Sequence, residues 1–202
     1  MAVPALPRDQ RRRRRLLLSL PARVIPPAFV PVPAGLSTAN RAALRSWGWT
    51  PLDHHGVPWP SSLALLRAGR LQVLSFAASG AFLIGLAAAL PRGVRSVSLA
   101  SAGAGLIAAA LPLDPPDGDP ARLRSWVHSW RAAVHAGGFL LAGPAGIVAV
   151  AVSRRRADVA LAAALTAAVG VGRTPGWYAF LAGFFGWTWN LARTVARERS
   201  RP

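Results

Sequence analysis

The chain has 202 residues and a net charge of +17, and all 24 of its basic residues are arginine. Apolar residues make up 52% of it and charged residues only 15%, and between residues 71 and 192 the charges collect in short clusters that separate long uncharged runs. This pattern is typical of polytopic helical membrane proteins. The absence of cysteine excludes disulfides, thiolate metal sites and cysteine nucleophiles. The arginines flank the apolar runs and form no single basic face, so we expect no nucleic-acid partner.

The first 45 residues are rich in proline and arginine, and we expect them to form a disordered basic segment. Residues 11–15 are consecutive arginines. The apolar run that follows them is too short for a span, and the prolines between residues 21 and 33 disfavour a regular helix. A mis-assigned start and a degraded first helix are the alternatives. Residues 46–70 carry tryptophans among prolines, which predicts an interfacial loop at the level of the lipid headgroups.

The remaining chain predicts an all-α, polytopic transmembrane helix bundle. Its apolar segments predict about five spanning helices, at residues 71–90, 94–113, 130–152, 157–171 and 176–192. The first segment has 20 uncharged residues, which at 1.5 Å per residue span roughly 30 Å, the thickness of the bilayer core. Gly80 and Gly85, with the alanines near them, offer small surfaces for close helix packing, and the second segment contains Gly103 and Gly105. Residues 193–202 are predicted to form a basic tail.

Candidate polar residues lie where the second apolar segment ends and the third begins. Asp114 follows the proline at the end of the second segment, and His135 lies shortly after Trp130, roughly 7 Å below the membrane interface. An ionisable residue within a span is a functional hypothesis by default. We expect Asp114 to be the partner of His135 and to fix its tautomer. The alternative is a structural hydrogen bond that ties the second segment to the third.

The loop between these segments carries clustered carboxylates at Asp114, Asp117 and Asp119. With His128 and His135 they are the candidate metal ligands of the chain, since Ca²⁺ prefers oxygen ligands and Zn²⁺ accepts imidazole. Their spacing lacks the EF-hand pattern and its closing glutamate. We therefore expect a solvated acidic loop, no bound metal and no cofactor.

Arginine counts predict an orientation. The loops after the first and third segments and the C-terminal tail carry two, three and four arginines, whereas the loop after the second segment holds the clustered aspartates. Cytoplasmic loops carry an excess of positive charge, so we place these loops and the tail in the cytoplasm and residues 114–129 outside the cell. With five spans and a cytoplasmic tail, the basic N-terminal segment lies outside the cell, which conflicts with the preference of positive charge for the cytoplasm. One further crossing would remove this conflict. The arginine clusters are expected to contact anionic lipid headgroups.

Parts of the chain resemble the domain of unknown function 998 family, which comprises small polytopic membrane proteins common in bacteria. The similar parts are residues 69–85 (GRLQVLSFAASGAFLIG), 105–116 (GLIAAALPLDPP) and 129–139 (SWRAAVHAGGF). Motif positions of the family fall on Asp114 and His135. The resemblance implies a plasma-membrane location and a six-helix fold, of which this chain shows five helices. It implies no settled activity.

We favour a non-enzymatic membrane protein with a polar pair, Asp114 and His135, near the outer face. Its role would be small-solute transport, or membrane assembly and stability, and a homo-oligomer is compatible with it. The alternative is a membrane-embedded lipid hydrolase, with His135 as base or metal ligand and Asp114 orienting it. A third hypothesis is binding to a lipid surface or to nucleic acid by the arginine run at residues 11–15, although no aromatic residue there could stack on bases.

Overall fold

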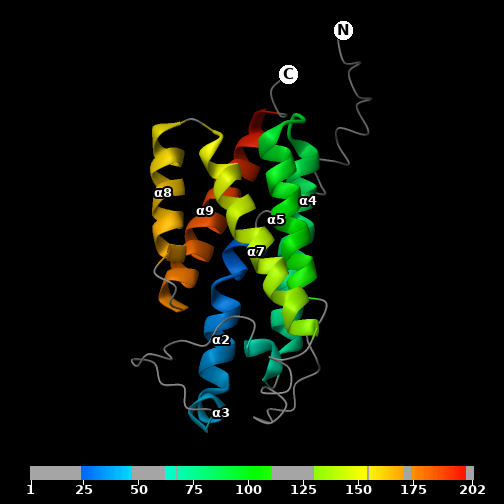
Figure 1. Cartoon of the computed structure of the whole chain (residues 1–202), viewed down its shortest axis with the longest axis vertical. Helices are drawn as coiled ribbons and strands as arrows, with labels where there is room; N and C mark the ends of the chain where they lie inside the picture. The colour runs from blue at the N-terminus through cyan, green and yellow to red at the C-terminus, as the bar shows by residue number, and fades with distance from the viewer. Residues whose placement is uncertain are drawn as a thin grey trace.

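The computed structural model describes residues 24–46, 62–66, 68–110, 130–153, 155–170 and 174–198. All regular structure in these ranges is helical, which confirms the all-α class (Figure 1). The helices are α2 (Pro31–Ala39), α3 (Arg41–Ser46), the 3-10 helix η1 (Ser62–Leu65), α4 (Arg70–Ala89), α5 (Val94–Ala110), α7 (Trp130–Ala151), α8 (Arg156–Gly170) and α9 (Thr174–Glu198).

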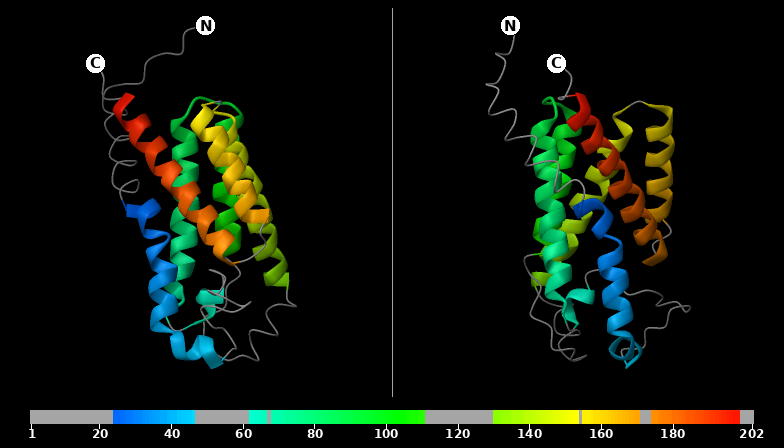
Figure 2. Two further views of the ribbon diagram at one scale, coloured as in Figure 1. Left: turned by 90° about the vertical axis from the view of Figure 1, so that its left-hand side faces the viewer. Right: turned by 180° about the vertical axis from the view of Figure 1, so that it is seen from behind.

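The long helices α4, α5, α7, α8 and α9 run alternately up and down (Figure 1). Each packs against the next one along the chain, and α9 also contacts α4 and α7. Figure 2 shows that α9 crosses the bundle obliquely. The turns after α4 and α7 and the end of α9 therefore share one end of the bundle, which we call the upper end. The start of α4, the end of α5 and the start of α7 lie at the opposite, lower end.

Within the part of the chain that the structure describes, two helices are long and apolar enough to cross a membrane by length and composition, namely Arg70–Ala89 and the Ala133–Ala151 part of α7. Val94–Ala110 is apolar but shorter. The last helix continues to Glu198, well past the end predicted at residue 192. This extension has a physical basis, because arginine is a good helix former and a cation near a helix C-terminus interacts favourably with the helix dipole.

The prediction that residues 1–45 are disordered is wrong for residues 24–45. Residues 24–28 are helical, and α2 and α3 follow them. The prolines are tolerated because Pro31 occupies the first position of α2 and Pro33 lies in the same first turn, where backbone N–H groups have no helical acceptor. The rest of that prediction, and most of the predicted interfacial loop, lie outside the described residues.

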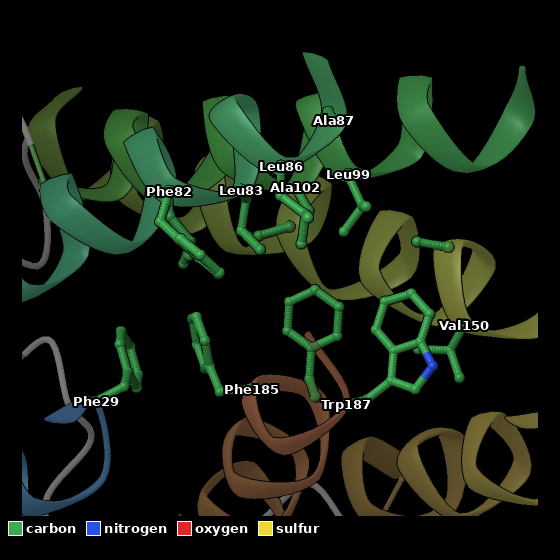
Figure 3. Packing of buried hydrophobic residues seen from close by; sticks show 14 of the residues in the cluster. Phe29, Phe82, Leu83, Leu86, Ala87, Leu99, Ala102, Val150, Phe185 and Trp187 are labelled. Carbon is green, nitrogen blue, oxygen red and sulfur yellow. The ribbon is translucent and has the colours of Figure 1, made fainter. Parts of the chain in front are cut away.

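Apolar contacts attach this N-terminal segment to the bundle. Phe29 is fully buried, and its ring stacks on Phe185 of α9 with a centroid distance of 4.3 Å (Figure 3). The same ring lies 5.9 Å from that of Phe76 on α4. These contacts were not predicted from the sequence, because the prolines were interpreted only as helix breakers. Phe29, which lies among them, was a sign that the segment could pack against a core.

Three helices approach one another closely at paired glycines. A Cβ built on Gly80 of α4 would lie 2.5 Å from the carbonyl oxygen of Gly103 on α5, and the reverse distance is the same. Gly105 of α5 and Gly138 of α7 form a second pair, in which a Cβ built on either glycine would lie 2.5 Å from the carbonyl oxygen of the other. The close packing expected at Gly80 is thus confirmed, and α5 is the helix that both pairs share.

Aromatic side chains fill the wider space between α9 and the other helices. The rings of Trp177 and Phe180 on α9 lie 5.6 Å apart, and Trp177 also meets the edge of Phe139 on α7 at 5.6 Å. The row continues with Phe180 stacked 5.8 Å from Phe184. The bundle is therefore held by backbone contact around α5 and by large side chains along α9.

Candidate functional site

His135 is buried in the second turn of α7, near the lower end of the bundle. Its Nδ1 lies 2.7 Å from the carbonyl oxygen of Ala109. A carbonyl oxygen only accepts hydrogen bonds, so Nδ1 carries a proton and donates it. Ala109 lies close to the end of the described part of α5. His135 therefore ties α7 to α5, which is the structural hydrogen bond that the sequence left open as the alternative.

Aromatic rings surround the imidazole. Phe139, one turn further along α7, meets it at 4.8 Å in an edge-on arrangement, and Phe76 of α4 lies at 6.3 Å. These two phenylalanine rings also contact each other at 5.5 Å. The two phenylalanine rings and the hydrogen bond from Nδ1 together hold the imidazole of His135 in one orientation.

The inner face of α4 carries two further buried polar side chains, Gln72 and Ser79. They are seven residues apart, so they lie two turns apart on the same face of the helix. Among the described residues, neither the amide atoms of Gln72 nor the hydroxyl of Ser79 has a hydrogen-bond partner. Buried polar groups of this kind are costly. Gln72 was not predicted as a site residue. Its polar amide in an otherwise uncharged apolar run could have indicated it.

The other predicted site residues cannot be placed beside His135. Asp114, Asp117, Asp119 and His128 lie outside the described residues, so the pairing of His135 with a carboxylate stays a prediction. Within the part of the chain that the structure describes, no group of histidine, aspartate and glutamate residues is arranged to hold a metal ion.

A small cavity lies at the centre of the bundle. Its volume is about 10 Å³, and its walls include Leu83, Leu106, Phe139, Trp177 and Phe184. A volume of this size is about the least that holds a single water molecule. Side chains from α4, α5, α7 and α9 therefore fill the centre where a solute path through these helices would run.

Comparison with known proteins gives no relative for this chain. No family model matches it, and neither does any curated protein or solved structure. The resemblance to the domain of unknown function 998 family stays a prediction from the quoted residues.

Proposed function

We propose that the chain is a non-enzymatic integral membrane protein in which α4, α5, α7, α8 and α9 each cross the bilayer. The observation that carries this proposal is the chemistry of the outward faces of α4 and α7. Beyond Arg70 and Trp130 at the helix starts, the exposed residues of these two helices are Leu71, Leu74, Ala78, Ala81, Ile84, Ala88, Ala133, Val134, Ala136, Gly137, Leu140, Leu141, Pro144 and Val148.

A helix that is apolar on every face either lies in a protein core or faces lipid. Burial decides between the two, because only 44% of the most apolar window of α4 and 39% of that of α7 is buried. Leu140 is 75% exposed and Leu74 62% exposed, which would be costly in water. A surrounding bilayer removes this cost and supports the placement of the bundle in a membrane.

The filled centre of the bundle favours a role in membrane assembly or stability over solute transport. The cavity among the aromatic rings has room for about one water molecule. The imidazole of His135 ties α7 to α5 through the carbonyl oxygen of Ala109, which is a packing role. Both observations support a compact helical scaffold.

Charge and tryptophan positions support an orientation with the upper end in the cytoplasm. The described arginines near the upper end are Arg92, Arg95, Arg155, Arg156, Arg193 and Arg197, and those near the lower end are Arg41, Arg45, Arg70 and Arg131. Positive charge favours the cytoplasmic side. Trp130 is 70% exposed at the lower end, and Trp189 is exposed further up α9, as expected for side chains at the two interfaces.

Cysteine labelling tests this proposal, because the chain has no native cysteine. Gly93→Cys lies in the turn at the upper end and Gly170→Cys at the other end of α8, and an added side chain meets nothing within 4 Å at either position. In intact cells, an impermeant thiol reagent should label Gly170→Cys and spare Gly93→Cys until the membrane is opened. Gly35→Cys, also in open space on α2, should behave as Gly170→Cys does.

The reverse labelling pattern would keep the spans and invert the orientation. Equal labelling of Gly93→Cys and Gly170→Cys in intact cells, or extraction of the protein from membranes by alkaline carbonate, would refute the spanning bundle.

A further inference from the structure

A cavity of about 300 Å³ opens at the upper end of the bundle, away from His135. The turn after α4, the first turn of α5, the start of α8 and the last part of α9 form its walls. The apolar lining residues are Leu90, Pro91, Trp187, Leu191 and Val195. The polar lining residues are Arg95, Arg155, Asp158, Asn190 and Thr194. Its volume falls at the lower limit of the range usual for small-molecule sites.

The polar side of this cavity has excess positive charge and an unused donor. Two guanidinium groups face it against one carboxylate. The Nε of Arg95 is buried, and it has no hydrogen-bond partner among the described residues. The carboxylate of Asp158 accepts a hydrogen bond from the hydroxyl of Ser153. A buried cationic donor that lacks an acceptor is costly, so the cavity favours an anion that supplies acceptor oxygens.

We propose that this cavity binds a phosphate group through Arg95 and Arg155. The planar guanidinium fork matches phosphate oxygens in a bidentate way, which a point charge does not. The side-chain amide of Asn190 supplies a neutral donor on the α9 wall, whereas the hydroxyl of Thr194 already donates to the backbone carbonyl of Asn190. The group is either the headgroup of an anionic phospholipid or a soluble phosphate ester. The apolar lining beside the arginines suits the glycerol and upper acyl chain of a lipid, and this lipid form of the ligand rests on the proposed membrane function.

Thermal unfolding of the full chain in neutral detergent tests the proposal, with phosphatidylglycerol, phosphatidylcholine and glycerol phosphate as the added ligands. Phosphatidylglycerol should raise the unfolding temperature in a saturable way. Arg95→Gln should weaken its apparent affinity about tenfold, because it removes a charge-assisted hydrogen bond. Arg92→Gln is the matched control, since Arg92 is exposed in the same turn and does not line the cavity. Asp158→Asn should tighten binding by removing the opposing charge.

The comparison of the added ligands distinguishes the two sources of the phosphate group. Stabilisation by phosphatidylglycerol alone identifies a lipid headgroup, and equal stabilisation by glycerol phosphate identifies a soluble ester. Equal responses of Arg95→Gln and Arg92→Gln would overturn the proposal, as would stabilisation by phosphatidylcholine and phosphatidylglycerol that Arg95→Gln does not change. Either outcome would leave the labelling result intact. If Arg95→Gln does not fold, Arg155→Gln provides the same comparison, because Arg155 is exposed on its outer side.

Discussion

Substituting alanine at Gly138 and at its neighbour Gly137 separates backbone contact from helix propensity in α7. A Cβ on Gly138 would lie 2.5 Å from the carbonyl oxygen of Gly105 and 2.7 Å from the backbone nitrogen of Ala109. At Gly137 an added Cβ meets nothing within 4 Å. Both are interior helix positions, so the propensity gain of roughly 0.5–1 kcal/mol from glycine to alanine is shared by the two variants.

The difference between the variants is therefore the cost of pushing α5 and α7 apart. The obstructing atoms are backbone, which cannot rotate out of the way as a side chain does, and overpacking of this kind costs about 1–3 kcal/mol. The movement also displaces Ala109, whose carbonyl accepts the hydrogen bond from His135. We expect Gly137→Ala to be neutral or stabilising and Gly138→Ala to be less stable than it by about 2 kcal/mol.

Thermal unfolding in detergent, followed by tryptophan fluorescence, measures this contrast. A difference of 2 kcal/mol corresponds to about 4–8 °C for a chain of this size. Gly105→Ala should resemble Gly138→Ala, since the two glycines face each other. Indistinguishable melting of Gly137→Ala and Gly138→Ala would show that the helices do not touch at this pair, and the reasoning from backbone contact would fail.

Two further substitutions test the buried histidine and the lipid-facing surface. His135→Leu removes the hydrogen bond from Nδ1 to the carbonyl oxygen of Ala109 and should destabilise the chain by about 0.5–1.5 kcal/mol, whereas His135→Gln keeps a donor and should cost less. Equal melting temperatures of the two variants would contradict a stabilising role of this hydrogen bond. Leu140→Arg introduces a charge at a position that is 75% exposed. If α7 faces lipid, this charge should raise the free energy of membrane insertion by about 2.5–3.5 kcal/mol and lower the inserted fraction. On a water-exposed surface the substitution would change stability by no more than about 0.5 kcal/mol. An unchanged inserted fraction would therefore count against a spanning α7.

The helical class was predictable because long uncharged runs and arginine-marked turns dominate the sequence. The starts of α4, α5, α7 and α8 fall at or beside predicted starts, where Pro, Gly and Arg interrupt the apolar pattern. The helices of residues 24–46 were missed because proline content alone does not say where in a helix each proline lies. The extent of α9 was missed because charge was used to end the helix, although arginine continues a helix well.

The candidate site was only partly predictable for a similar reason. His135 stands out in sequence because Arg131, beside the start of the predicted span, is the one other ionisable side chain within it, and the structure places His135 in a buried position. Its observed partner is the backbone carbonyl of Ala109, and a carbonyl group has no signature in an amino-acid sequence. The polar cavity at the upper end was not predictable either, because Arg95, Arg155 and Asn190 belong to segments that meet only through the fold.

The packing around α5 gives an independent argument for the membrane placement. In water, a glycine in a helix interior is destabilising, and burial of larger apolar side chains is the usual source of helix association. In lipid that driving force is absent, and helices associate through close van der Waals contact between small residues. Here the crossings of α4 with α5 and of α5 with α7 are built on glycine pairs at backbone contact, while large apolar side chains such as Leu74 and Leu140 point outward. At these two crossings the smallest residues lie where the helices meet, and bulky apolar residues such as Leu74 and Leu140 lie on the outward surface, where a bilayer would solvate them.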